Sequence, residues 1–154
     1  MADPIILYVD ADACPVKDEV IRVATRHKLK VYLVSDGGLR PYREPHVETV
    51  FVPSGPDAAD NWIAERILAQ DICITNDTPL AGQCLEKGAF ALRPTGKPFT
   101  QDNIGMALAN RELMNSLRET GAITGGPRPF AKKDRSAFLN ALEPLVQKAK
   151  RERG

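Results

Sequence analysis

The stretch Ile5-Ile6-Leu7-Tyr8-Val9-Asp10-Ala11-Asp12 decides the predicted fold. Its first five residues are apolar without polar alternation, which predicts a strand buried on both faces and hence central in a parallel sheet. Asp10 and Asp12 belong just past the end of this strand, because burying an unpaired charge is costly. Ligands of open α/β sheets bind at the carboxyl ends of the strands. The first strand therefore places two carboxylates at the predicted functional edge.

Strand and helix patterns alternate from this stretch as far as Leu92. The further predicted strands cover residues 30–34, 49–52, 71–75 and 89–92, and helices are expected over residues 15–27, about 57–70 and 79–87. The alternation predicts βαβ units in a three-layer α/β/α fold with a mainly parallel five-stranded sheet. The order 3-2-1-4-5 keeps the most apolar strand central and the crossovers right-handed. A crevice is then expected between the carboxyl ends of strands 1 and 4.

The remainder of the chain predicts two helices separated by loops. Residues 93–99 are expected to form a loop, followed by a helix from Thr100 or Asp102 to about residue 120. A final helix is expected over residues 134–150, kinked by Pro144, with fraying at residues 150–154. We expect one domain over residues 1–154, with a basic C-terminal helical segment, residues 128–154.

The bulk composition is that of a globular protein, with 43% hydrophobic and 27% charged residues. No apolar run reaches the roughly 20 residues that a membrane-spanning helix needs, and no basic leader precedes an apolar segment. The three cysteines, Cys14, Cys73 and Cys84, are scattered and form no CxxC pair. These features predict a cytoplasmic protein with reduced thiols and no membrane association.

Charge is distributed unevenly along the chain. From Arg128 to the end there are eight Lys and Arg against three Asp and Glu, so this segment carries +5 and the remainder, given the total of +1, carries −4. A basic segment beside an acidic site is compatible with nucleic-acid binding. A solvated amphipathic helix is the alternative explanation of the same charges.

Five aspartates are the candidate metal ligands of the carboxyl edge: Asp10, Asp12, Asp57, Asp60 and Asp77. Hard cations such as Mg²⁺ and Mn²⁺ take oxygen ligands, and a cation relieves the repulsion between close carboxylates. Four of the five also have a structural alternative, whereas Asp10 is the hardest to explain structurally. Asp12 can be an N-cap, Asp57 can complement a helix dipole, Asp60 can be merely solvated, and Asp77 can be a turn residue.

The remaining reactive side chains are less informative. Cys14 is expected near a helix N-terminus, which favours a thiolate, but the neighbouring carboxylates oppose it, so a partly buried structural cysteine is the preferred interpretation. Cys73 and Cys84 are predicted to lie in the core. His27 and His46 have no partner at ligand spacing and are expected at the surface.

Four stretches, residues 8–16, 57–62, 74–80 and 126–130, resemble the YaiI/YqxD family of small uncharacterised bacterial proteins. The resemblance implies a fold related to the PIN-like nucleases and brings no established activity. Asp10, Asp57 or Asp60, and Asp77 match the places of acids in PIN-type ribonucleases. A fourth acid, often found after the fifth strand of those enzymes, is absent from residues 93–96, and Asp12 or Asp102 is its candidate substitute.

The leading hypothesis is a nuclease dependent on Mg²⁺ or Mn²⁺, acting on nucleic acid with RNA favoured, in which Asp10 and Asp77 are catalytic. The predicted nucleic-acid-binding residues are basic and lie in loops or in the C-terminal segment: Arg93, Lys97, Arg128, Lys132 and Lys133. A phosphatase of the haloacid-dehalogenase type, with Asp10 as nucleophile and Ser35 after the second strand, is one alternative. A non-catalytic scaffold that binds nucleic acid or protein is the other.

Overall fold

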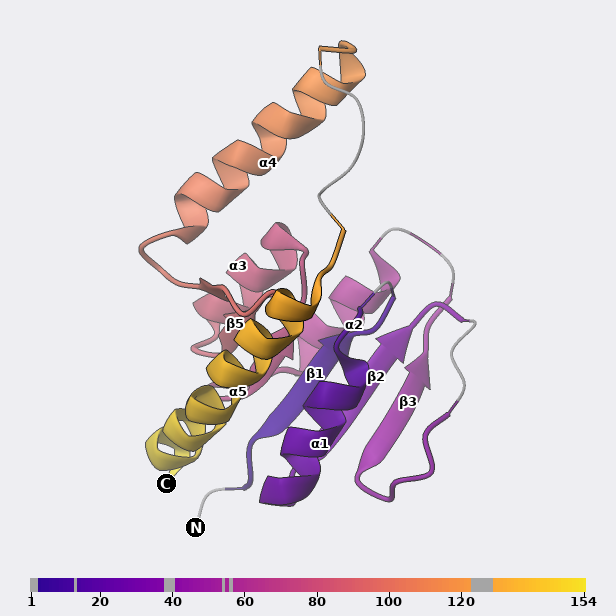
Figure 1. Ribbon diagram of the computed structural model, residues 1–154, viewed down its shortest axis with the longest axis vertical. Helices are drawn as coiled ribbons and strands as arrows, with labels where there is room; N and C mark the ends of the chain where they lie inside the picture. Colours follow the sequence, from indigo (N-terminus) through magenta and orange to yellow (C-terminus); the bar gives the residue numbers. More distant parts are fainter. Residues whose placement is uncertain (1–2, 13, 38–40, 54, 56, 123–128) are drawn as a thin grey trace.

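A mainly parallel sheet of six strands forms the centre of the molecule (Figure 1). The computed structural model describes residues 3–12, 14–37, 41–53, 55, 57–122 and 129–154. The strand order is β3-β2-β1-β4-β5-β6, as predicted for the first five, which are parallel. In chain order the strands are β1 (Ile6–Asp10), β2 (Lys30–Ser35), β3 (Val47–Phe51), β4 (Ile72–Ile74), β5 (Phe90–Leu92) and β6 (Pro98–Phe99).

The strand β6 corrects the prediction of a loop over residues 93–99. It pairs antiparallel with β5, with Phe99 opposite Ala91 and Pro98 opposite Leu92. A two-residue strand carries no periodicity that a sequence pattern could reveal, and Pro is tolerated in a strand at the sheet edge, where β6 lies.

β1 is the central strand, as its apolar sequence predicted. It pairs with β2 on one side and β4 on the other, so that Val9 lies between Leu33 and Ile74. Leu7 and Val9 are fully buried. Burying side chains of this size contributes about 1.5–3 kcal/mol each, which makes β1 an anchor of the core.

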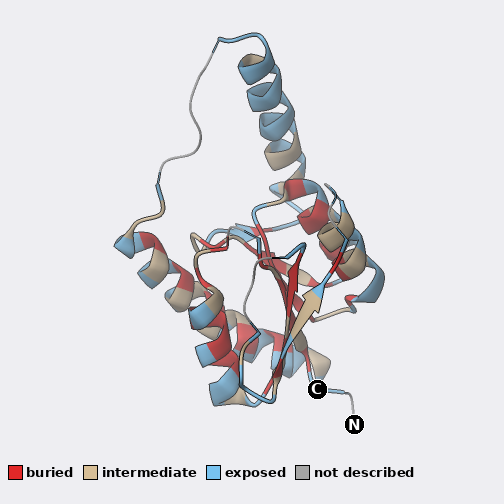
Figure 2. Cartoon of the chain, turned by 90° about the vertical axis from the view of Figure 1, so that its right-hand side faces the viewer, coloured by how far each residue is buried: buried red, intermediate tan, exposed pale blue. Residues whose placement is uncertain are grey.

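Helices cover both faces of the sheet, giving the predicted three layers (Figure 1). The helices are α1 (Lys17–His27), α2 (Ala58–Arg66), α3 (Thr78–Glu86), α4 (Ile104–Glu119) and α5 (Lys132–Arg153). α1 and α5 pack on one face, where Val20, Phe138 and Leu142 join the larger core cluster. α2 and α3 pack on the other, where Ile63 and Leu80 lie against Tyr8. Burial is concentrated in these layers (Figure 2).

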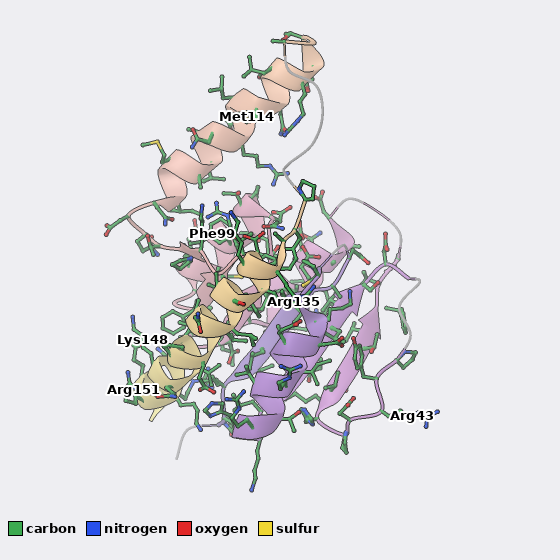
Figure 3. All side chains as sticks on the ribbon, viewed as in Figure 1. Arg43, Phe99, Met114, Arg135, Lys148 and Arg151 are labelled. Atoms are coloured by element: carbon green, nitrogen blue, oxygen red, sulfur yellow. The ribbon has the colours of Figure 1, made fainter. Side chains whose placement is uncertain are left out.

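α4 stands clear of the three layers (Figures 1 and 2). None of its sixteen residues is buried. Its first turns contact α3, since Ile104 and Ala107 pack against the cluster that contains Ala81 and Phe99. Elsewhere it exposes apolar side chains, including Met106, 69% exposed, and Met114, which lies away from the sheet in Figure 3.

A buried ion pair ties the end of α5 to Asp71, the residue that precedes β4. Arg153 Nη2 lies 3.0 Å from Asp71 Oδ1, and the same carboxylate accepts hydrogen bonds from the backbone N–H groups of Ile6 and Leu68. Fraying of residues 150–154 was therefore a wrong prediction, because this pairing carries α5 to Arg153. The helix also runs through Pro144 without interruption.

His27 and His46, expected at the surface, are partly buried, and each has a side-chain partner. His27 Nε2 lies 2.6 Å from Glu143 Oε2, and its side chain is only 15% exposed. Arg26 contacts the other oxygen of Glu143 at 3.2 Å, so two residues of α1 are tied to α5. His46 Nε2 lies 2.7 Å from the hydroxyl of Thr25. Both partners are far away in the sequence, so no local pattern could reveal them.

Candidate functional site

Three aspartates gather at the carboxyl edge of the sheet between β1 and β4. Asp10 is the last residue of β1, Asp77 follows β4, and Asp60 lies in the first turn of α2. Partial burial, the charges of Asp77 and Asp10 and a hydrogen bond with Asp77 raise the pKa of Asp60 to about 7. A carboxyl group with this pKa is partly protonated at neutral pH, so the cluster can both hold and release a proton.

Asp10 is oriented by Thr75, the residue after β4. The Thr75 hydroxyl donates to Asp10 Oδ2 at 3.0 Å and accepts from the backbone N–H of Asp77 at 2.9 Å. Burial raises the pKa of Asp10, the hydrogen bond from Thr75 opposes that shift, and the charges of Asp77 and Asp12 add to it. One buried hydroxyl therefore fixes the positions of both aspartates that the sequence nominated as catalytic.

Asp77 has two roles, one for each carboxylate oxygen. Oδ1 accepts from the backbone N–H of Leu80 at 2.8 Å, which makes Asp77 the N-cap of α3. Oδ2 lies 3.6 Å from Nη1 of Arg111 on α4. Asp77 thus has a structural role as an N-cap, where the alternative interpretation of the sequence had a turn residue, and its second oxygen is left at the crevice.

Asp12 and Asp57 lie at the margins of the cluster. Asp12 accepts from the Ser35 hydroxyl at 2.7 Å and from the backbone N–H of Asp36 at 3.1 Å, so it ties the end of β1 to the end of β2. It is not the N-cap of α1, because Val16 occupies that position. Asp57 is exposed at the N-cap position of α2, makes no side-chain capping bond and acts on Asp60 only as a nearby charge.

Asp102 does not supply the fourth acid. β6 runs antiparallel to β5, so the chain after Phe99 runs toward the amino end of β5. Gln101 accordingly contacts the carbonyl of Leu85, near the end of α3 that is far from Asp77. Asp102 is therefore placed away from the carboxyl edge, because the unpredicted β6 reverses the chain.

The donor chemistry of Asp10, Asp60 and Asp77 suits a hard divalent cation. Burial and, after it, the charges of Asp77 and Asp10 raise the pKa of Asp60, and a cation would relieve the repulsion between these carboxylates. Within the described residues, however, no three His, Cys, Asp or Glu side chains are already arranged to hold a metal ion. Binding would require these side chains to turn toward one another.

Basic residues lie near the same edge. Arg93 and Lys97 are joined by a backbone hydrogen bond of 3.0 Å in the turn after β5. Lys132 and Lys133 are exposed in the first turn of α5. Arg93 is partly used in packing, since its guanidinium lies 3.9 Å from the centroid of the Phe99 ring and burial lowers its pKa. Arg128 lies outside the described residues.

Part of the basic charge of the C-terminal segment has a structural use. Arg135 lies between α5 and α1 (Figure 3), where it donates to Glu19 and to the carbonyl of Pro15, both at 2.9 Å. Arg153 is paired with Asp71. The net charge of this segment therefore overstates the number of cations that are open to a ligand.

The cysteines behave as structural residues. Cys14 is buried, and desolvation raises the pKa of its thiol, which argues against a reactive thiolate. Cys73 and Cys84 lie in the core as predicted.

One hollow on the described part of the molecule is separate from the acids. A mostly apolar groove of about 490 Å³ lies between α5 and the β5–β6 edge, and its lining includes Phe90, Phe99, Leu145 and Lys148. None of the five candidate aspartates lines it. We place the candidate site at the acid edge, because the groove lacks groups that could perform hydrolysis.

The sequence did not single out Arg111, which the structure brings to this edge. Arg111 lies on the helix that stands clear of the core, and no motif or spacing marks it. Thr75 lies in the stretch of residues 74–80 that carries the family resemblance, without having been singled out there, and Ser35 was noted only for the phosphatase alternative.

Comparison with known proteins gives one consistent family. The family described as "Uncharacterized BCR, YaiI/YqxD family" matches residues 8–148. A UPF0178 protein of Parvibaculum lavamentivorans is 61% identical over 145 residues, covering 94% of this chain and 95% of the relative. One of Rhodospirillum rubrum is 56% identical over 148 residues, covering 96% and 99%. No solved structure matches the chain significantly. In the described part of the chain, no helix is long and apolar enough to cross a membrane.

Proposed function

We propose that this chain, which belongs to the YaiI/YqxD family of uncharacterised proteins, is a divalent-metal-dependent nuclease that hydrolyses phosphodiester bonds, with RNA the favoured substrate. The observation that carries the proposal is the approach of Asp10, Asp60 and Asp77 at the carboxyl edge, where burial and then the charges of Asp77 and Asp10 raise the pKa of Asp60 to about 7. The family resemblance, through its relation to PIN-like nucleases, supports the same choice.

The residues at the carboxyl edge would have different roles in this reaction. Asp10 and Asp77, with Asp60, would hold Mg²⁺ or Mn²⁺, which when bound supplies positive charge at the scissile phosphate and activates water. Thr75 keeps Asp10 turned toward the crevice. The carboxyl of Asp60, whose pKa is about 7 in the metal-free protein, would lose its proton when it binds the cation, so cation binding should strengthen as pH rises through neutrality. Lys97, Lys132 and Lys133 contribute backbone affinity without sequence readout.

The two alternatives make different demands on the site. In the phosphatase, Asp12 would be the acid/base partner of Asp10. Both oxygens of Asp12 accept hydrogen bonds, from Ser35 and Asp36, so both are used in tying the end of β1 to the end of β2, which weakens that alternative. The scaffold needs no metal, and the absence of a ready-made metal geometry in the described residues is compatible with it.

Calorimetric titration of Mn²⁺ and Mg²⁺ into the metal-free protein tests the proposal. Binding should be abolished in Asp10→Asn and unchanged in Asp102→Asn, whose exposed carboxylate lies away from the edge. Cleavage of labelled single- and double-stranded RNA and DNA should follow the same pattern. Absence of cation binding, even with a short oligonucleotide present, would contradict the nuclease and favour the scaffold. A phosphoaspartate trapped at Asp10 would establish the phosphatase instead.

A further inference from the structure

Arg111 is the one residue of α4 whose side chain forms an ion pair with the acid edge in the described part of the chain. Gln101, before α4, contacts Leu85 near the end of α3, and Ile104 approaches Gly82. Arg111 then reaches Asp77 at the beginning of α3. α4 therefore runs back along α3 toward the carboxyl edge and delivers a guanidinium beside the carboxylates.

The guanidinium of Arg111 retains most of its binding capacity. It has five N–H donors. In the described residues its ion-pair partner is Asp77, through a single N···O contact of 3.6 Å, longer than an ordinary hydrogen bond. The side chain is 42% exposed. This contact neutralises charge but leaves the planar fork of donors available to a better-fitting anion.

We propose that Arg111 binds a phosphodiester group of the nucleic acid laid across the acid edge, exchanging Asp77 for the phosphate. The inference rests on the proposed function, because it takes the substrate class from it. Asp10, Asp60 and Asp77 repel a phosphate by themselves, so a cation at this spot is needed for a nucleic-acid backbone to approach. A guanidinium can supply two parallel donors to two phosphate oxygens, a geometry that lysine lacks.

Two other arginines near this edge, among the residues that the structure describes, are more fully used than Arg111. Arg93 stacks on Phe99 at 3.9 Å. Arg135 makes two short hydrogen bonds at 2.9 Å, to Pro15 and Glu19. Removing either would disturb packing, whereas Arg111 makes one long contact from a helix with no buried residue. A variant at position 111 therefore reports on ligand binding with little effect on the fold.

The first test measures binding of a short fluorescent oligouridylate by anisotropy, with Ca²⁺ in place of the catalytic cation. Arg111→Ala should weaken binding about tenfold and lower the slope of log affinity against log salt by about 0.7, the value for one lost single-strand phosphate contact. The affinity of Arg111→Lys should lie between those of the unchanged protein and Arg111→Ala, because lysine keeps the positive charge but lacks the parallel donors of the guanidinium. Arg118→Ala, an exposed arginine about two turns further along α4, is the matched control and should change affinity less than twofold.

The second test releases Arg111 from its present partner in the absence of divalent cations. Asp77→Asn removes the competing charge, while asparagine still caps α3. This variant should bind the oligouridylate about tenfold more tightly than the unchanged protein. The gain should vanish in the double variant Asp77→Asn/Arg111→Ala. Thermal unfolding of each variant verifies that the fold is retained.

The outcomes separate this inference from the nuclease proposal. Unchanged binding in Arg111→Ala, or a gain in Asp77→Asn that persists without Arg111, would overturn the inference even if the protein cleaves RNA. Arg111-dependent binding by a protein that cleaves no nucleic acid would uphold it and refute the nuclease.

Discussion

The hydroxyl of Thr75 donates a hydrogen bond to Oδ2 of Asp10 at 3.0 Å, across the boundary between the ends of β4 and β1. The same hydroxyl accepts from the backbone N–H of Asp77 at 2.9 Å. This single buried hydroxyl therefore helps to position the two aspartates on either side of the crevice. Its removal should affect both of them.

Replacing Thr75 by valine keeps the shape of the side chain and removes the hydroxyl. The pKa of Asp10 should rise further, because the hydrogen bond from Thr75 now opposes the shift caused by burial. The free energy of unfolding should fall by about 1–3 kcal/mol, since two buried polar groups lose their partner. Carbon-13 NMR titration of the Asp10 carboxyl and denaturant unfolding measure the two effects. Thr75→Ser is the control and should restore both values nearly to those of the unchanged protein.

Asp60 should make stability depend on pH. The pKa of Asp60 is about 7 in the folded protein against an ordinary 3.8, so between these values the folded state holds a proton that the unfolded state has lost. The free energy of unfolding should therefore fall as pH rises from about 4 to about 7. Solvent screening at this partly exposed group limits the effect to about 1–2 kcal/mol.

The comparison of Asp60→Asn with the unchanged protein isolates this contribution. The free energy of unfolding of Asp60→Asn should lack the part of the decline with pH that Asp60 causes. The variant should therefore be more stable than the unchanged protein near pH 8. Denaturant unfolding at intervals between pH 4 and pH 8 measures it, with Asp102→Asn as the control for loss of an exposed carboxylate. Parallel stability curves for Asp60→Asn and the unchanged protein would show that the like charges are not coupled as inferred.

The ion pair between Arg153 and Asp71 should be worth more than its position near the chain end suggests. Asp71 is 1% exposed, so Arg153→Ala would leave a buried carboxylate without its cation and should lower the free energy of unfolding by about 3 kcal/mol. Arg151→Ala removes an arginine of the same helix that points into solvent (Figure 3) and should change stability by less than about 0.5 kcal/mol. Equal effects of the two substitutions in urea unfolding would refute the structural role of the pair.

Whether an element could be predicted from the sequence depends on whether the residues that determine it are close together in the chain. The apolar run before Asp10 and the alternation of strands and helices were sufficient to predict the sheet order, because central parallel strands need continuous apolar sequence. β6 is too short to show a periodicity, and the pairing of Arg153 with Asp71 and the contact between His27 and Glu143 join residues far apart in the chain. Short-range sequence patterns do not reveal these features.

The candidate site divides in the same way. Asp10 and Asp77 could be predicted, since each follows a recognisable strand and strand ends meet at one edge. Asp60 lies in the cluster and Asp57 at its margin because of the angle at which α2 packs on the sheet. The spacing of residues in the sequence does not specify that angle. Arg111 could not be found, because the path of α4 past α3 follows from the unpredicted reversal at β6.

Gly96 should be irreplaceable in the turn that carries Arg93 and Lys97. Its φ is +89°, and a Cβ added there would lie 2.6 Å from the backbone oxygen of Ala137 in α5. Gly96→Ala therefore combines backbone strain with a clash against main chain, and should lower the free energy of unfolding by about 2–4 kcal/mol. Gly105→Ala is the matched control, because Gly105 lies in α4 with nothing within 4 Å of an added Cβ. It should be neutral or stabilising by up to about 1 kcal/mol, since alanine favours helix. Calorimetric melting of both variants measures the contrast, and a Gly96→Ala protein as stable as Gly105→Ala would mean that the turn does not pack on α5 as described.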